Sequence, residues 1–327
     1  MNAFITGGTG FLGAHLIHVL SNQGWTMFVL RREKSDVSRI EGLPNVNFVS
    51  GDITDIESLR KVIPDKIEAV FHLAGSVAVL PAHLEHTRFA INELGTRNMV
   101  DVCLEKSIGR FIYTSTVAIF DWNHGPRIDE NYPKNEWSDD QYVRSKKLAD
   151  DEVDKGVKRG LDAVYLHPSA IFGRYDRDGW ATVFKEIKKG VPFNMSTPGG
   201  GSICNARTVM AAHVKAYHVG KKGERYILGG TDYTWYEVMQ KIAVILGVPP
   251  LRKPLPHPLF NVTCILERFF SGLMGKEPLL SKHVQDIVGA YIYSTSGKAV
   301  KELEYDISNI DDMLNESYKS LKEEGLI

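Results

Sequence analysis

The sequence predicts an α/β protein with a doubly wound, parallel β-sheet and a smaller second lobe. Short apolar runs alternate with helical patterns along most of the chain, which is the order of a sheet covered by helices on both faces. After Pro168 this alternation loosens. Glycine and proline then accumulate around Pro192, Pro198 and Gly199 and again over residues 249–258, which indicates a second lobe.

Seven short apolar runs are expected to form the strands of the main sheet. They are NAFIT (2–6), WTMFVL (25–30), NVNFVS (45–50), AVFHLA (69–74), RFIYTS (110–115), AVYLHP (163–168) and ERYIL (224–228). The segment from Phe11 to Asn22 has a helical pattern and is followed by Gly24, so we expect it to form the first crossover helix.

Composition and charge exclude several classes of protein. The 327 residues suffice for one large domain with a smaller companion, and 39 Lys plus Arg nearly balance 40 Asp plus Glu, which gives no electrostatic reason for a nucleic-acid partner. Cys103, Cys204 and Cys264 are far apart, so neither a disulfide framework nor a metal site is expected.

Location follows from two further patterns. A glycine run begins at Gly7, too early for a signal peptide, and charged residues interrupt the apolar segment 249–275. We therefore expect a cytoplasmic chain with no membrane span and a small-molecule substrate.

The stretch TGGTGFLG (6–13) directly follows the first expected strand and opens the first expected helix. Gly7, Gly10 and Gly13 have the spacing GxxGxxG. Glycines at such a turn allow backbone N–H groups to approach a pyrophosphate and let the helix pack closely on the sheet. We interpret the stretch as a dinucleotide-binding turn, with a ligand-free glycine loop as the alternative.

The end of the second strand, FVLRRE (28–33), bears on which dinucleotide is bound. Arg31 and Arg32 stand where a carboxylate would bind the ribose hydroxyls of NAD, and a guanidinium suits the additional phosphate of NADP. NADP(H) is therefore favoured and NAD(H) is possible, while a solvated basic loop is the alternative. After the third strand, Asp52 would accept from the adenine amino group and Ile53 would pack on the ring. Asp52 would equally serve as a helix cap.

The stretch QYVRSKKL (141–148) places Tyr142 and Lys146 four residues apart, on the same side of a helix. A phenol has a pKa near ~10 and is a useful acid or base at neutral pH only if its anion is stabilised. Lys146 is expected to supply that positive charge. The alternative is a solvated helix face.

Taken together, the motifs resemble those of the extended short-chain dehydrogenase/reductase family, which includes sugar-nucleotide epimerases and dehydratases, dihydroflavonol reductases and 3β-hydroxysteroid dehydrogenases. The motifs that carry the resemblance, in family order, are TGGTGFLG, GDITD, FHLAG, IYTSTVAIF, YVRSK, HPSAIFG and GERYILGG. The stretches GERYILGGTDYTWYEV and SGKAVKELEY are most similar to the dihydroflavonol-reductase-like and steroid-dehydrogenase-like branches.

The resemblance implies a Rossmann domain and a discontinuous substrate-binding lobe. The Rossmann domain is expected over residues 1–167, with returning segments at about 203–228 and 289–302. The lobe is expected over residues 168–202, 229–288 and 303–327.

The resemblance also implies roles for individual residues. Tyr142 and Lys146 are the expected catalytic pair, and Thr116, or its neighbour Ser115, is expected to polarise the substrate carbonyl. The expected cofactor-binding residues are Gly7, Thr9, Gly10, Phe11, Leu12, Gly13, Arg31, Arg32, Asp52, Ile53, Leu73, Ala74, Gly75, Tyr142, Lys146, Pro168, Ser169 and Ala170. His72 and His167 are expected to be structural, and Asn92 to be a helix cap or a tie between helix and sheet.

Three functions agree with these residues. The first is a reductase that transfers hydride from NADPH to a carbonyl, with Tyr132, Trp137, Trp180 and Phe193 as candidate rings around an apolar or aromatic substrate. The second is a sugar-nucleotide epimerase or dehydratase with a tightly held cofactor, and the third is a non-catalytic NADPH-binding sensor. The charged outer face of the helix that carries Tyr142 is compatible with a monomer or a homodimer.

Overall fold

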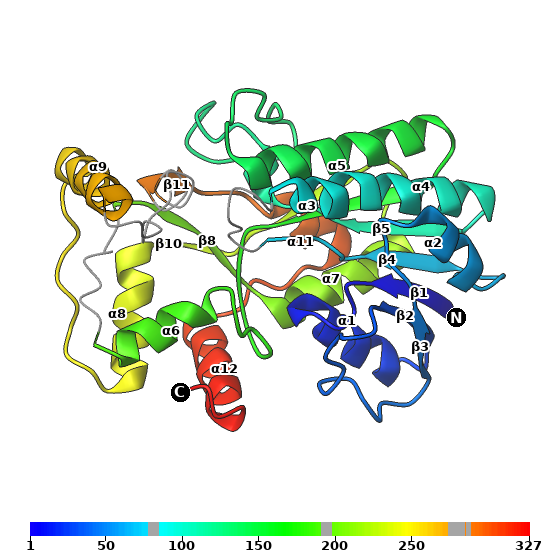
Figure 1. Cartoon of the computed structure of the whole chain (residues 1–327), viewed down its shortest axis with the longest axis horizontal. Coiled ribbons are helices and arrows are strands. Elements are labelled where there is room, and N and C mark those ends of the chain that lie inside the picture. Colours follow the sequence, from blue (N-terminus) through cyan, green and yellow to red (C-terminus); the bar gives the residue numbers. More distant parts are fainter. Residues whose placement is uncertain (78–84, 191–197, 274–284, 286–288) are drawn as a thin grey trace.

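The chain forms a seven-stranded sheet and, beside it, a smaller four-stranded sheet (Figure 1). The computed structural model describes residues 1–77, 85–190, 198–273, 285 and 289–327, without the side chains of residues 267–269, 272 and 273. The larger sheet has the order β3-β2-β1-β4-β5-β6-β9, and all its neighbouring strands are parallel. Its strands are β1 (Asn2–Thr6), β2 (Thr26–Arg31), β3 (Val46–Ser50), β4 (Ala69–His72), β5 (Arg110–Thr114), β6 (Ala163–Pro168) and β9 (Arg225–Leu228).

Helices cover both faces of the larger sheet (Figure 1). One face carries α1 (Phe11–Asn22), α7 (Ala206–Val219) and α11 (Gly297–Leu303). The opposite face carries α2 (Ile56–Val62), α4 (Gly95–Glu105) and α5 (Gln141–Lys158). The short α3 (Glu85–Phe89) and the π-helical turn η2 (Ala90–Leu94) lead directly into α4.

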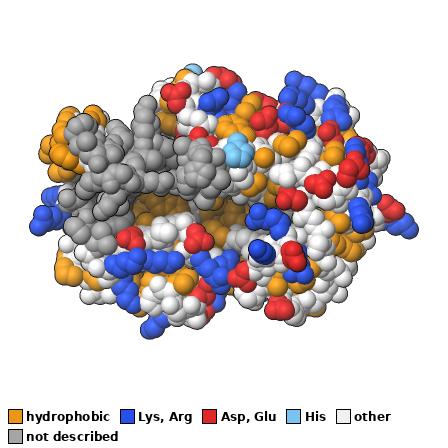
Figure 2. All heavy atoms as spheres, in the orientation of Figure 1, with side chains coloured by type: hydrophobic (Ala, Val, Ile, Leu, Met, Phe, Trp, Pro, Cys, Tyr) orange, Lys and Arg blue, Asp and Glu red, His pale blue; other side chains and the backbone are white. Residues whose placement is uncertain are grey.

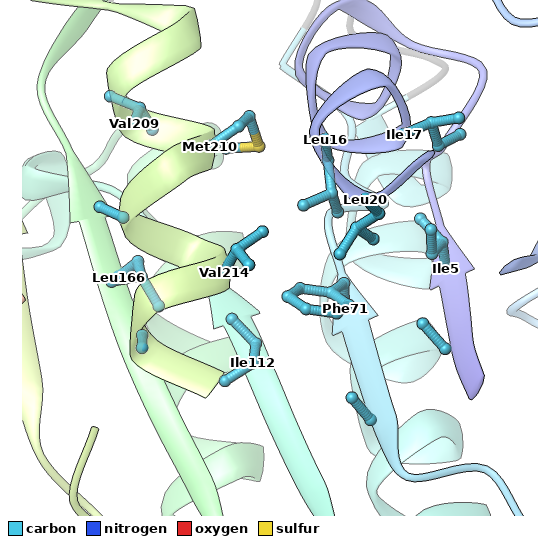
Figure 3. Close-up of a cluster of buried hydrophobic side chains, with 14 of the residues drawn as sticks. Ile5, Leu16, Ile17, Leu20, Phe71, Ile112, Leu166, Val209, Met210 and Val214 are labelled. Carbon is cyan, nitrogen blue, oxygen red and sulfur yellow. The ribbon is translucent and has the colours of Figure 1, made fainter. Parts of the chain in front are cut away.

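Apolar side chains fill the space between the sheet and each helical layer. Figure 3 shows Leu16 and Leu20 of α1 facing Phe71 of β4, and Val214 of α7 facing Ile112 of β5. Each fully buried side chain of this size contributes roughly 1.5–3 kcal/mol. Because both faces of the sheet are covered, its strands read as continuous apolar runs, and this is why the sequence reveals them.

The smaller lobe is built around β8 (Gly200–Asn205). Its other strands are β7 (Ala170–Phe172) and β11 (Tyr291–Ile292), both parallel to β8, and β10 (Thr231–Thr234), which is antiparallel. Its helices are α6 (Ala181–Lys188), α8 (Trp235–Leu246), α9 (His257–Leu273) and α12 (Ile310–Glu323). Phe184 and Trp235 lie in the apolar core that joins α6, α8 and α12.

The predicted fold class is confirmed. All seven apolar runs are strands of the larger sheet, and the first crossover helix has the predicted bounds. The second strand extends to Arg31, so this residue lies on the sheet and not in the following loop. The division of the chain at the residues given above stays a prediction.

The cysteines and the helices were also subjects of sequence-based expectations. Cys103, Cys204 and Cys264 are all buried. In the part of the chain that the structure describes, no helix combines the length and the apolar content that crossing a bilayer requires.

Candidate active site

A cavity of about 1120 Å³ lies between the carboxyl edge of the larger sheet and the lobe. It is lined by the turns after β1, β2, β3 and β4 and by residues of α6 and α8. Figure 2 shows a hollow near the middle of this face with hydrophobic side chains on its floor. The predicted cofactor-binding residues among the lining are Gly7, Thr9, Gly10, Phe11, Leu12, Gly13, Arg31, Arg32, Asp52, Ile53, Leu73, Ala74, Gly75 and Ser169.

The glycine turn is sterically required at two positions. Gly7 has a φ of +71°, and a Cβ atom there would lie 2.6 Å from the backbone nitrogen of Ala74. A Cβ atom on Gly13 would lie 2.2 Å from the carbonyl oxygen of Gly7. Helix α1 begins after Gly10 without a side-chain cap, so the N–H groups of its first turn are left for another acceptor.

The end of β2 gives one edge of the cavity a basic character. Arg31 is the last residue of the strand, and its guanidinium carbon lies 5.4 Å from the ring centroid of Phe48. Arg32 is exposed and donates its backbone N–H to Ser35 Oγ at 3.1 Å. Arg31, Arg32 and Ser35 all line the cavity, so two guanidinium groups and a hydroxyl are available to an anion here.

Asp52 and Ile53 follow β3 and also line the cavity. Asp52 Oδ1 accepts from the backbone N–H and the hydroxyl of Thr54, both at 2.8 Å. The cap of α2 is Asp55, which accepts from two first-turn N–H groups. The interpretation of Asp52 as the helix cap is therefore wrong, because the residue that caps this helix lies three positions later.

Tyr142 lies in the first turn of α5, near the side chain of Thr116, which follows β5. Asp140 fixes the start of this helix by accepting from the N–H of Val143 at 2.7 Å. Burial raises the pKa of Tyr142 to about 12, and the side chain of Thr116 opposes this rise. The structure thus brings together the predicted phenol and the predicted hydroxyl, and the hydroxyl belongs to Thr116.

Lys146 is buried one turn further along α5. Its ammonium donates to the carbonyl oxygen of Thr114 at 2.9 Å and lies 4.9 Å from the ring centroid of Tyr113. Burial lowers the pKa of Lys146 to about 8, and the charge of Asp150 acts in the opposite direction. The groups that shift the pKa of Tyr142 are Thr116, Asp140 and Arg88. Lys146, which was expected to lower the pKa of this phenol by its charge, is not one of these groups. Its ammonium is held instead by the backbone carbonyl of Thr114 at the end of β5.

The remaining predicted residues lie around this pair. Ser115 is buried beside Thr116 and donates its backbone N–H to the carbonyl of Leu166. Pro168 ends β6 and Ala170 begins β7. Among the described residues that line the cavity, neither Pro168 nor Ala170 appears, nor do Tyr142, Lys146, Thr116 and Ser115.

A chain of hydrogen bonds connects β1 to α5. Thr96 donates to the carbonyl of Asn92 at 2.6 Å, so its oxygen is left to accept from Nε2 of His72 at 3.0 Å. Nδ1 of His72 then accepts from Thr6 at 2.7 Å, and burial lowers the pKa of His72 to about 3, which keeps it neutral. Asn92 also donates to Ser145 on α5 at 2.9 Å. His72 is therefore structural, and Asn92 is a tie rather than a helix cap.

The sequence as a whole now places the chain among known proteins. Residues 3–229 match the pattern that defines the NAD dependent epimerase/dehydratase family. The chain belongs to this family. The family is part of the extended short-chain dehydrogenase/reductase superfamily, whose members are enzymes that use NAD(P) and act on small molecules.

Relatives that cover most of the chain include a reductase and a sterol demethylase by name. The chain is 28% identical to a putative dihydroflavonol 4-reductase of Synechocystis sp., over 99% of this chain and 95% of the relative. It is 27% identical to sterol demethylase protein B of Methylococcus capsulatus, over 83% and 84%. These relatives support an oxidoreductase, while the family as a whole also contains epimerases.

Solved structures show the same fold over the full length. The crystal structure of gox2253 superposes with a TM-score of 0.85 at 26% identity and covers 99% of both chains. The UDP-glucuronic acid 4-epimerase of Bacillus cereus in complex with NAD superposes with a TM-score of 0.77 at 17% identity, again over 99% of both chains. At that identity the second comparison shows the fold alone.

The residues of this family member fit a bound dinucleotide. A Cβ atom at Gly7 or Gly13 would collide with backbone atoms of the protein itself, so these glycines let the turn pack closely, and the uncapped start of α1 lines the cavity. A pyrophosphate there would accept from backbone N–H groups at the positive end of a helix dipole. Among the described residues, no group of three or more His, Cys, Asp or Glu side chains is placed to hold a metal ion.

The lobe contributes residues to the cavity that sequence reasoning largely missed. Trp180, which was predicted, stacks on Trp235 with ring centroids 4.4 Å apart, and Val183 and Met239 lie beside them in the lining. Trp235 stands within a quoted motif, but the motif does not reveal that α8 turns this ring toward α6. Tyr132 and Trp137 pack against other rings away from the cavity, and Phe193 lies outside the described residues.

Proposed function

We propose that this chain is an NADP(H)-dependent oxidoreductase that reduces the carbonyl group of a small apolar or aromatic aldehyde or ketone. The observation that carries the proposal is the placement of Tyr142, in the first turn of α5, near the side chain of Thr116, which follows β5 at the carboxyl edge of the sheet. The reduced nicotinamide supplies a hydride to the carbonyl carbon when it is bound. Tyr142 gives its proton to the carbonyl oxygen, the C=O double bond becomes a single bond, and Thr116 donates a hydrogen bond to the same oxygen.

The protonation state of Tyr142 supports the reductive direction. With a pKa of about 12, the phenol keeps its proton at neutral pH. A proton donor must be protonated before the reaction, whereas the reverse oxidation requires the phenolate. Lys146 approaches this site as an ammonium held by Thr114, and family resemblance assigns it to the ribose hydroxyls of the cofactor.

The choice of NADP(H) rests on the end of β2. Arg31 and Arg32 line the cavity where an acidic residue would be needed to bind the ribose hydroxyls of NAD. Ser35 adds a hydroxyl beside them. A phosphate on the ribose would form charge-assisted hydrogen bonds with these guanidinium groups.

The substrate class rests on the lobe side of the cavity. The stacked rings of Trp180 and Trp235, together with Val183 and Met239, offer an apolar wall suited to a ring system. The names of the two relatives refer to a dihydroflavonol and a sterol, which are ring compounds of low polarity. We therefore expect cyclic ketones and aromatic aldehydes to be better substrates than sugar nucleotides.

The test is consumption of NADPH with a panel of cyclic, aromatic and aliphatic carbonyl compounds, followed by the absorbance of the reduced nicotinamide. Replacement of Tyr142→Phe removes only the proton donor, so turnover should fall about 10²–10⁴-fold. NADPH affinity, measured by fluorescence titration, should stay within a few-fold. Tyr217→Phe serves as the matched control, since Tyr217 packs against Trp25 on the opposite helical layer.

Two outcomes would overturn the proposal. Interconversion of a nucleotide sugar without net use of NADPH would identify an epimerase. Tight binding of NADPH with no turnover of any carbonyl compound in the panel would identify a sensor.

A further inference from the structure

Asp150 is a buried carboxylate on the same helix as the proposed active-site pair. It follows Lys146 by four residues on α5, so the two side chains lie on the same face of the helix. Its exposed fraction is 0%. A charge taken out of water at this depth is costly unless other groups compensate it.

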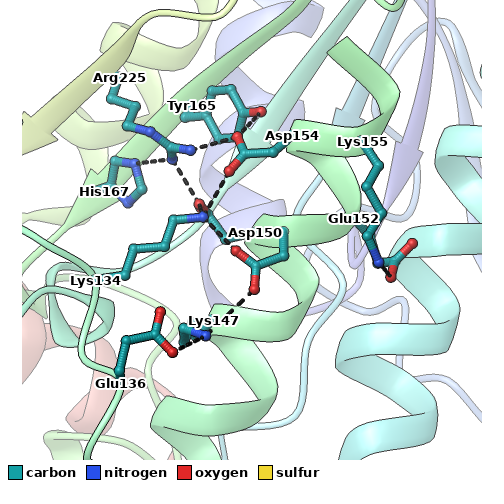
Figure 4. A network of polar contacts seen from close by, with 11 residues as sticks. Lys134, Glu136, Lys147, Asp150, Glu152, Asp154, Lys155, Tyr165, His167 and Arg225 are labelled. Carbon is teal, nitrogen blue, oxygen red and sulfur yellow. Dashed lines mark hydrogen bonds and ion pairs between the residues drawn. The ribbon is translucent and has the colours of Figure 1, made fainter. Parts of the chain in front are cut away.

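Two cations from other parts of the chain hold Asp150 in place (Figure 4). Oδ2 of Asp150 lies 2.8 Å from Nζ of Lys134, in the segment before α5, and 2.7 Å from a terminal nitrogen of Arg225 on β9. These contacts with Lys134 and Arg225 hold the pKa of Asp150 below its ordinary value against the effect of burial. Asp150 is therefore ionised at neutral pH.

The same two cations are shared with other carboxylates. Lys134 also lies 2.7 Å from Asp151 and from Asp154, and Arg225 lies 2.6 Å from Asp154. Asp151 also pairs with Lys147 at 3.6 Å, and Lys147 pairs with Glu136 at 2.7 Å. Three cations thus serve four carboxylates, which leaves one negative charge in the group. Oδ1 of Asp150 is buried and accepts no hydrogen bond from the part of the chain that the structure describes.

Lys146 is the cation that faces this excess charge along α5. Burial lowers the pKa of Lys146 to about 8, and the charge of Asp150 is the influence that raises it. Three other titratable groups of the described chain that lie near Lys146 carry no charge at neutral pH. Tyr113 of β5 presents its ring face, His72 of β4 is neutral, and Tyr142 of α5 is a neutral phenol.

Further titratable groups face Asp150 from the remaining elements packed around it. His167 of β6 lies 3.5 Å from Arg225, and burial lowers the pKa of His167 to about 3. Tyr165 of β6 donates to Asp154 at 2.7 Å, and burial raises the pKa of Tyr165 well above its ordinary value. Neither group supplies charge at neutral pH.

We propose that Asp150 is a positioning residue for the proposed reductase, whose carboxylate, fixed by Lys134 and Arg225, holds Lys146 as an ammonium at neutral pH. This inference rests on the proposed function for its catalytic meaning. The effect of Asp150 on the protonation of Lys146 does not depend on that function, because both residues belong to this chain. Asp150 acts through Lys146 and touches no reacting atom.

The variant Asp150→Asn tests the inference because it keeps the shape of the side chain and removes its charge. The full-length protein is labelled with ¹³C at lysine Cε, the Lys146 signal is assigned by its loss in Lys146→Arg, and the signal is followed through a pH titration. The pKa of Lys146 should fall by about one pH unit in Asp150→Asn. Asp154→Asn is the matched control, since Asp154 contacts the same two cations but lies one turn further from Lys146, and it should leave this pKa within a few tenths of a unit.

A second variant keeps the test decisive if Asp150→Asn does not fold. Lys134→Met removes one cation beside Asp150, so the pKa of Lys146 should rise. Opposite shifts in the two variants are not expected of residues that only support the fold. An unchanged pKa of Lys146 in whichever of these variants fold would overturn the inference.

Turnover provides a separate readout. The alkaline limb of kcat/KM should move to lower pH in Asp150→Asn by the same amount as the pKa of Lys146 and should not move in Asp154→Asn. If no carbonyl compound is turned over, the proposed function fails, while the NMR titration still decides the role of Asp150. If turnover occurs and the NMR titration shows no shift, only the present inference fails.

Discussion

Burial shifts the pKa values of the neighbours Tyr142 and Lys146 in opposite directions. The phenol pKa rises to about 12 and the ammonium pKa falls to about 8, although their ordinary values nearly coincide. As pH increases, Lys146 therefore loses its charge well before Tyr142 loses its proton. The alkaline limit of activity should accordingly report the lysine rather than the tyrosine.

Arg31 provides a test of cofactor choice at a single position. Arg31→Asp replaces a guanidinium that lines the cavity with a carboxylate, which would repel the additional phosphate of NADPH. We expect NADPH affinity to fall about 10–100-fold, since hydrogen bonds to charged groups contribute about 1.5–3 kcal/mol, and NADH affinity to change much less. Fluorescence titration with both cofactors measures the difference.

Lys34→Asp is the control for Arg31→Asp. It changes the net charge by the same amount at an exposed residue of the loop that follows β2, outside the cavity lining of the described chain. Equal losses for NADPH and NADH in Arg31→Asp, or equal effects of the two variants, would contradict a role for Arg31 in reading the phosphate.

Single residues differ in how far the sequence reveals them. Part of the need for glycine is local and is shown by the spacing, because Gly7 has a positive φ and a Cβ atom at Gly13 would meet the carbonyl oxygen of Gly7 in the same turn. The close approach of Gly7 to Ala74 depends on the tertiary structure and leaves no local signal. The partner of Lys146 is the backbone carbonyl of Thr114, which any residue would supply and which leaves no sequence signal. Asp150 was likewise not predicted, because its cations come from a loop and a strand distant in sequence.

At the level of elements, the position of α5 fixes the proposed site. Asp140 caps this helix, and Tyr142 stands in its first turn. Asp55 caps α2 in the same way, with its side chain accepting from first-turn N–H groups. The two caps are alike chemically but lie at different distances from the proposed chemistry.

This pair of caps separates stability from function. Asp140→Ala and Asp55→Ala should each destabilise the protein by about 1 kcal/mol, a loss of about 2 °C in Tm. Only Asp140→Ala should also lower kcat, severalfold, because fraying of α5 displaces Tyr142 from Thr116. Thermal denaturation and steady-state kinetics on both variants test this, and an equal loss of kcat in the two would argue against it.

The sequence predicts long elements better than short ones. The seven strands of the larger sheet and α1 follow from apolar runs and helical periodicity. Strands β7, β10 and β11 span two to four residues and form only through pairing with β8, so no local pattern reveals them. The π-helical turn that places Asn92 between β4 and α5 also depends on tertiary hydrogen bonds.

At the level of the whole molecule, residues 173–177 join three distant parts of the chain. The carbonyl of Arg174 accepts from His15 on α1 at 2.9 Å, and the N–H of Tyr175 donates to Ser320 on α12 at 2.9 Å. Arg177 lies 2.7 Å from Asp36 in the loop after β2. The loop that carries the proposed phosphate site is thereby tied to the lobe.

Arg177→Met should weaken NADPH binding a few-fold with little loss of global stability. Arg177 pairs with both Asp36 and Glu324, and partly exposed ion pairs contribute only about 0–1 kcal/mol each. Arg174→Met removes the pair with Glu323 but leaves the loop untouched, so its NADPH affinity should match that of the unaltered protein. Titration calorimetry measures the NADPH affinity of both variants. Equal affinities would show that the contacts of Arg177 with Asp36 and Glu324 do not affect NADPH binding.

The order of strands in the larger sheet also has a consequence during synthesis on the ribosome. Strand β9 pairs with β6, yet the lobe segments β7, α6 and β8 are translated between them. A nascent polypeptide therefore presents the outer edge of β6 unpaired until β9 emerges, and such edges invite pairing with other chains. Chaperones would have most to protect during that interval.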